Sequence, residues 1–294
     1  MTSASPCIGL CTLDDATGYC LGCARTGAEI AAWRTEEPSF RAAVWDALPA
    51  RFQILGAACR RLPMETQEIR SFVARTLRDG TGAWTIGVVG AVAEFADAPG
   101  SRTEVVEDGA RIEASNAGGR LRFAIDAHVR AVTFAPPETP TNEQKVVLAV
   151  QRARGGPPVG TALTDLGPDM SAISADARAK RLFDLGLGRA EARFCVRCGA
   201  GARNDALRAA TGAALPDALP RLAGQLIGDS PARVVESALG RVEALGPIPD
   251  ANGRSPAGPH THLLIDSLAT QRAMPAGMDL PAAYIPGAIF YPGA

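Results

Sequence analysis

Long apolar runs are missing from this sequence. The longest candidate, residues 86–95, is far shorter than the roughly eighteen residues that a membrane helix needs, and it contains Glu94. The first residues have neither the basic start nor the apolar stretch of a secretory signal. These absences predict a protein that has no membrane association and resides in the cytoplasm.

An excess of charge is also missing. The chain has 30 basic and 31 acidic residues, so its formal net charge is −1. Such a balance supplies no field that would attract nucleic acid or anionic lipid. No glycine-rich phosphate loop, dinucleotide fingerprint or Gly-x-Ser-x-Gly motif is present. Neither nucleic acid nor a membrane is therefore indicated as a partner.

Cysteine, by contrast, is present seven times. An odd number argues against a complete disulfide framework, and a reducing compartment favours metal binding or redox chemistry for closely spaced cysteines. The chain is long enough for one large domain or two ordinary ones, and 47% hydrophobic residues is typical of a globular protein.

The apolar pattern predicts an α+β protein in two parts. Residues 1–60 form a small helical module that is stapled by a metal through four cysteines, and residues 61–294 form a larger domain with an antiparallel sheet and helices. In the module, helical spacing begins near Thr26, and a second helix starts at Pro38 and runs to about Arg61, with Pro49 as a kink or break.

In the larger domain, the sequence predicts a helix over 63–79 that ends at Gly80, and then β structure. Apolar runs and turn signals predict strands over 84–95, 103–106, 110–114, 120–125, 130–134, 146–150 and 192–196, of which the four over 103–134 form an antiparallel meander. Helices are predicted over 175–185, 203–211 and 216–226. Residues 234–244 fit either a strand or a helix, and the Pro- and Gly-rich segments 246–259 and 275–294 are predicted to be loops.

The four N-terminal cysteines follow the spacing Cys7-x3-Cys11-x8-Cys20-x2-Cys23. A separation of two residues, as in Cys-x-x-Cys, is usual for two ligands of one metal. Between the two pairs, Asp14, Asp15 and Gly18 allow the chain to fold back. Four thiolates suit tetrahedral zinc or an iron–sulfur cluster. The spacing predicts a metal site but does not choose the metal, and a reactive Cys20/Cys23 disulfide is a third possibility.

The same segment resembles the DUF1289 family of small bacterial proteins. The resemblance covers about residues 5–53 and rests on Ser5 to Cys11, Gly18 to Cys23, Arg25-Thr26, Glu29 to Trp33, and the helix with Leu48-Pro-Ala-Arg51. Ala24 departs from the glycine that is usual there. Members are commonly described as predicted iron–sulfur proteins, so the resemblance implies a cluster held by the four cysteines. It also implies that Ile30 and Trp33 pack against the metal loop and that Arg25 places positive charge near the thiolates. The ordinary expectations are plain packing, which is preferred for Trp33, and a solvated arginine. The remainder, from about residue 84, resembles an uncharacterised bacterial domain of no assigned activity.

Two further groups are candidates for metal ligands. Cys195 and Cys198 form a Cys-x-x-Cys pair that would be half of a metal site or a redox pair, although two buried free thiols are the preferred interpretation. His260 and His262 would project to one side of an extended segment, with Asp266 or Glu94 as a third ligand, against a plain hydrogen-bonded pair. Cys59 is interpreted as a core residue of its helix.

Three functions follow from these candidates. The first is an iron–sulfur protein for electron transfer, or for sensing oxidants or iron, with a protein redox partner. The second is a structural zinc module fused to a ligand-binding or protein-interaction domain. The third is a metal-dependent enzyme with its site near His260 and His262.

Overall fold

The computed structural model describes residues 4–218, 220–222, 231–249 and 255–293. Its first two helices begin at residues that favour a helix N-terminus. Helix α1 (Gly27–Ala32) starts after Thr26, whose side chain exchanges hydrogen bonds with Glu29 in a capping box. Helix α2 (Pro38–Leu55) has proline in its first turn and runs through Pro49 without a break.

Helix α2 is shorter than the sequence suggests. It ends at Leu55 because Gly56 adopts a left-handed conformation and caps the helix. Arg60–Arg61 then form strand β1, so the predicted continuation of the helix to Arg61 is wrong. Cys59 consequently lies in the connecting loop, half-buried beside a small apolar cluster, and not in a helix.

Helix α3 (Thr66–Asp79) ends before Gly80 as predicted but starts three residues after Pro63, at a capping box formed by Glu65 and Glu68. Its apolar side packs into the main core through Ile69, Val73 and Leu77.

The predicted single strand over 84–95 is in fact a hairpin of β2 (Gly82–Val88) and β3 (Ala91–Phe95), with Val88 opposite Ala91. Gly90 in the turn has φ +90°, and a Cβ there would lie 2.3 Å from the backbone nitrogen of Leu268. The turn is therefore open only to glycine, and the two apolar strands beside it look like one run in the sequence.

A seven-stranded antiparallel sheet contains this hairpin, in the order β1-β7-β8-β15-β2-β3-β14. Its other strands are β7 (Val129–Thr133), β8 (Val146–Gln151), β15 (Tyr284–Pro292) and β14 (His260–Leu263). The loop predicted over 275–294 is wrong, because β15 lies in the middle of this sheet between β8 and β2. Pro286 is accommodated there at a register shift between Pro286 and Ala288.

The second sheet has eight antiparallel strands in the order β4-β5-β6-β13-β12-β11-β10-β9. Its strands are β4 (Glu104–Asp108), β5 (Arg111–Asn116), β6 (Gly119–Ala124), β9 (Thr164–Pro168), β10 (Arg181–Asp184), β11 (Ala192–Cys198), β12 (Ala232–Ser237) and β13 (Gly240–Ala244). The predicted meander is confirmed for β4 to β6, but its fourth strand, over 130–134, is wrong, because β7 pairs with β1 and β8 in the other sheet. Residues 234–244 belong to two strands and no helix.

The helix predicted over 175–185 is wrong. Only Ala175–Ala177 forms a short 3-10 turn, and β10 pairs with β9 and β11. The helix predicted over 203–211 is present as α4 (Ala202–Ala209). Residues 215–218 and 220–222 are helical, whereas the rest of the predicted helix over 216–226 and part of the loop over 246–259 lie outside the described residues.

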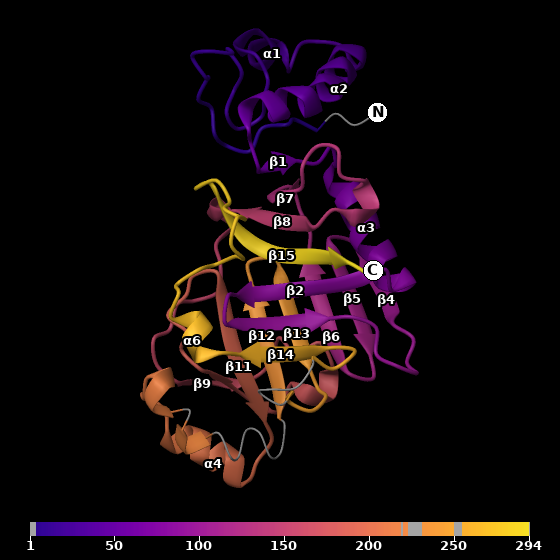
Figure 1. The fold of residues 1–294 in the computed structure, drawn as a ribbon. Helices are drawn as coiled ribbons and strands as arrows, with labels where there is room; N and C mark the ends of the chain where they lie inside the picture. Colours follow the sequence, from indigo (N-terminus) through magenta and orange to yellow (C-terminus); the bar gives the residue numbers. More distant parts are fainter. Residues whose placement is uncertain (1–3, 219, 223–230, 250–254, 294) are drawn as a thin grey trace.

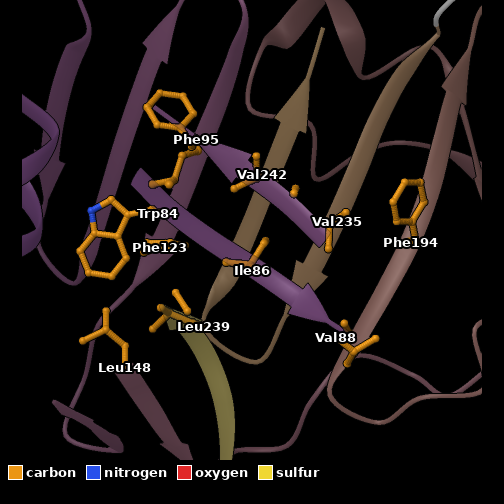
Figure 2. Packing of buried hydrophobic residues seen from close by; sticks show 14 of the residues in the cluster. Trp84, Ile86, Val88, Phe95, Phe123, Leu148, Phe194, Val235, Leu239 and Val242 are labelled. Carbon is orange, nitrogen blue, oxygen red and sulfur yellow. The ribbon is translucent and has the colours of Figure 1, made fainter. Parts of the chain in front are cut away.

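The two sheets pack face to face with their strands crossing steeply, and the helical module lies beyond β1 at one end of the seven-stranded sheet (Figure 1). Figure 2 shows side chains of β2 lying against Phe194, Val235 and Val242 of the other sheet, in a core that includes buried Trp84 and Phe123. The chain is thus α+β as predicted, and mostly β after the module. No helix among the described residues is long and apolar enough to cross a membrane.

Candidate metal centre

The second cysteine pair lies in a tight turn. The backbone N–H groups of Cys23 and Ala24 both donate to the carbonyl of Cys20, at 3.2 and 2.7 Å. Ala24 closes the turn with φ +55°, a left-handed conformation that favours glycine. Cys20 and Cys23 are 0% and 1% exposed. Position 24 therefore favours a residue that tolerates a positive φ.

The first cysteine pair is held against this turn by backbone contacts. Leu13 and Cys20 form an antiparallel bridge, and the Leu21 N–H donates to the Thr12 carbonyl at 2.8 Å. A Cβ at Gly22 would lie 2.4 Å from the carbonyl oxygen of Leu10, so the two chain segments touch only because residue 22 is glycine. These contacts bring the segment that contains Cys11 beside Cys20.

Each of the four thiols has polar partners within the loop or next to it. The Gly9 N–H donates to Cys7 Sγ at 3.3 Å, and the Cys20 thiol donates to the Leu10 carbonyl at 3.1 Å. The pKa of Cys11 is raised, first by the neighbouring Cys7 and then by burial. Burial raises the pKa of Cys23 to about 11, against the opposing effect of Arg25. All seven cysteines of the chain are free.

Arg25 is the positive charge nearest to the buried pair. It is only 4% exposed, its Nε donates to Cys23 Sγ at 3.4 Å, and its guanidinium lies 4.7 Å from the ring centre of Trp33. Trp33 packs with Val44 and Leu48 in the module's own core. Arg25 is therefore not the solvated residue of the ordinary expectation, and it places a fixed cation and a donor beside a thiol.

Arg51 ties α2 to the cysteine loop. Its guanidinium forms a two-point ion pair with Glu29, at 2.6 and 3.0 Å, and donates to the carbonyl of Ala24 at 3.3 Å. It also lies 5.0 Å from the ring centre of Tyr19. Arg51 and Glu29 thus fix the helices around the Cys20–Cys23 turn.

The N-terminal end of the loop is anchored to the larger domain. Ile8 is 3% exposed and packs in an apolar cluster with Val147 of β8 and Tyr284 of β15. Arg61 of β1 donates to the carbonyl of Ser5. The cysteine loop consequently lies on the seven-stranded sheet.

The donor set of this loop is suited to a thiophilic metal, since four cysteines lie within seventeen residues of the sequence. As the side chains stand, however, no group of three or more His, Cys, Asp or Glu among the described residues is arranged to hold a metal ion. Cys20 points its thiol at a backbone carbonyl, and Cys11 is exposed. A metal would therefore bind through reoriented and deprotonated cysteine side chains.

The histidine candidates are only partly brought together. His260 and His262 lie on one side of β14, and their ring centres are 4.9 Å apart. His260 is 1% exposed, donates from Nδ1 to the Gly258 carbonyl at 2.9 Å, and lies opposite Glu94 of β3. Asp266 is instead exposed on the short helix α6 (Ile265–Leu268). Burial and the neighbouring His260 lower the pKa of His262.

The structure does not bring Cys195 and Cys198 together. Both are buried in β11, but residues three apart in a strand face opposite sides of the sheet. Cys198 lies in the main core between the sheets, whereas Cys195 packs with Leu182 and Val234. Burial raises the pKa of Cys195 well above its ordinary value.

A buried ionic network was not anticipated from the sequence. On the face of the eight-stranded sheet away from the core, Asp169 contacts Arg197 at 3.0 Å and Arg241 at 2.7 Å, and Arg197 contacts Glu243 at 2.7 Å. All four side chains are at most 5% exposed. Charged residues on alternate positions, Arg193 and Arg197 in β11 and Arg241 and Glu243 in β13, are the signal in the sequence that this face is charged.

Two families match the chain. A family model described as a protein of unknown function, DUF1289, matches residues 5–52. A second, described as a family of unknown function, DUF6925, matches residues 68–294. No curated protein and no solved structure matches the chain.

Proposed function

Since the chain belongs to the DUF6925 family and carries a DUF1289 module at residues 5–52, we propose that it is a metal-binding protein whose module holds an iron–sulfur cluster through Cys7, Cys11, Cys20 and Cys23. The cluster would serve electron transfer or the sensing of oxidants or iron. When bound, such a group supplies reversible one-electron chemistry.

The observation that carries this proposal is that other residues of the module hold the cysteine loop in its conformation. Gly22 packs on the backbone of Leu10, and Ala24 takes a strained conformation to complete the turn. Arg25 directs a buried guanidinium at Cys23, where it would offset the negative charge of a four-thiolate centre. Residues that only filled space would not need these conformations.

Exposure favours an electron-transfer role. Cys20 and Cys23 are buried, whereas Cys11 is exposed and Cys7 is half-buried. A centre held by these four residues would be shielded on one side and reach the surface on the other. A redox partner would have access to that surface.

Structural zinc is the second candidate, because the module's own core is small. Its buried apolar residues are Ala24, Trp33, Val44, Leu48 and Phe52. A core of this size usually needs a staple, and a zinc ion bound to four thiolates would supply one without redox chemistry.

The residue assignment is tested by metal content per chain after purification without oxygen. We expect Cys11→Ser and Cys20→Ser each to lose most of the metal. Cys59→Ser is the matched control, since burial raises the pKa of the Cys59 thiol to about 12 and the residue lies outside the loop. Retention of the full metal content by both loop variants would contradict the assignment.

A further inference from the structure

A cleft of about 400 Å³ lies where the cysteine loop meets the seven-stranded sheet. The sheet side of the cleft contributes Arg61, Arg130 and Arg152, and the loop side contributes Ser5 and Cys7. No aspartate or glutamate is among the described residues that line it. The cleft therefore has a strongly positive wall.

The sheet itself brings two of these arginines together. Arg61 of β1 lies opposite Val132 of β7, so Arg130, two residues earlier in β7, is its diagonal neighbour on the same face. Like charges at such positions repel one another. Burial is the main cause that lowers the pKa of Arg61 to about 10, and the positive charge of Arg130 is the second cause. An arrangement that opposes folding in this way points to a ligand that relieves it.

Because Arg61 is buried, the lack of a carboxylate in the described lining of the cleft makes its positive charge more costly. Arg61 is 7% exposed and donates to the Ser5 carbonyl through Nη1, but its buried Nε has no acceptor among the described residues. Glu65 is near enough to raise its pKa but does not line the cleft. Buried guanidinium groups are normally paired, as Arg197 is with Asp169 in the other sheet.

The other two arginines are held in place by the backbone. Arg130 donates through Nη1 to the carbonyls of Ala127 and Val129, and Arg152 donates through Nε to the carbonyl of Ala282 at 2.8 Å. Since a guanidinium has five N–H donors, these bonds orient both side chains and leave donors for a ligand. Such fixed guanidinium groups match the oxygens of phosphate and carboxylate.

We propose that this cleft binds a small molecule with a phosphate or carboxylate group, which Arg61, Arg130 and Arg152 hold between them. Its volume lies within the range of ordinary small-molecule pockets, about 300–1,000 Å³. Because Cys7 lines the same cleft, the ligand would lie next to a proposed metal ligand and at the boundary between module and domain. The binding site requires no metal, so the proposal is independent of the metal's identity.

Isothermal titration calorimetry on the full chain tests the proposal, with inorganic phosphate and succinate as separate probes at fixed ionic strength in a chloride buffer. We expect saturable binding of one equivalent of at least one probe, and the tighter probe distinguishes phosphate from carboxylate recognition. Arg130→Gln and Arg152→Gln should each weaken that binding roughly tenfold or more, because a charge-assisted pair is lost.

Arg102→Gln is the matched control, since Arg102 is exposed and lies outside the cleft, and it should bind as the unaltered chain does. Arg61→Gln also removes the bond to Ser5, so the two partly exposed arginines carry the test, with their folding checked by circular dichroism. The proposal would be overturned if neither probe showed saturable binding. It would also be overturned if the Arg130→Gln, Arg152→Gln and Arg102→Gln variants bound with equal affinity. Metal content is measured separately, so failure here differs from failure of the metal assignment.

Discussion

Gly22→Ala is the most informative single substitution in the cysteine loop. A Cβ at this position would lie 2.4 Å from the carbonyl oxygen and 2.9 Å from the Cβ of Leu10. Since non-bonded carbon contacts usually lie near 3.5–4.0 Å, the Leu10 segment would have to move by roughly 1 Å. Overpacking of this kind costs about 1–3 kcal/mol. The same movement takes Cys11 away from the Cys20–Cys23 turn, so metal content should fall as well.

Gly27→Ala is the matched control for that substitution. Its Cβ would meet only Leu13 Cδ1, at 3.5 Å, which is an ordinary contact in the first turn of α1. This change should stabilise the module by about 0.4–1 kcal/mol through the unfolded chain. Urea denaturation, followed by tryptophan fluorescence to which Trp33 and Trp45 contribute, and metal analysis measure both effects. If Gly22→Ala matched Gly27→Ala in midpoint and metal content, the proposed contact between the two cysteine segments would be refuted.

The remaining predictions concern the supports of the loop and the larger domain. Arg51→Met should lower the free energy of unfolding by about 1.5–3 kcal/mol in urea, because hydrogen bonds to a charged group are lost. Burial raises the pKa of Glu29, but the bonds from Arg51 outweigh it and hold that pKa below its usual value. The part of the wild-type advantage that comes from Glu29 should therefore be complete above the usual carboxyl pKa and be lost as the pH falls through the lowered one. Ala24→Gly should change the thermal midpoint little, whereas Ala24→Val should lower it clearly, because the left-handed conformation penalises a β-branched side chain. Asp169→Asn should destabilise the larger domain by about 3–5 kcal/mol, because it removes the buried carboxylate that pairs with both Arg197 and Arg241.

Three results would count against these expectations. An Arg51→Met effect that stays constant down to strongly acidic pH would exclude Glu29 as the partner. Equal midpoints for the glycine and valine variants at position 24 would contradict the conformation of the turn. A change below 1 kcal/mol for Asp169→Asn would mean that the network is open to water, as surface ion pairs are.

The C-terminal end of α3 and the β4–β6 meander could be predicted because their signals are local. A cap, a glycine and a hairpin turn each act within a few residues. The place of β15 could not be predicted in this way. Its Pro286 and Gly287 are typical of a loop, and only pairing with β8 and β2, far away in the sequence, makes the segment a central strand.

The same distinction applies to the sites. Cys7 to Cys23 are close in sequence, so spacing alone indicates a shared site. The arginine cleft combines residues 61, 130 and 152, which only the sheet brings together. The left-handed turn at Ala24 was also hidden, because alanine gives no sign of positive φ. Segment 175–185 was misassigned because its alanines favour a helix, while β10 gains its stability from two neighbouring strands.

Metal and sulfide analysis of protein purified without oxygen tests the central claim most directly. We predict iron and acid-labile sulfide bound to the chain, with visible absorption that dithionite bleaches and that Cys11→Ser removes. A colourless protein with one equivalent of zinc would contradict the iron–sulfur proposal and would support the structural zinc site instead. A chain with neither metal would contradict the claim that Cys7, Cys11, Cys20 and Cys23 form a metal centre.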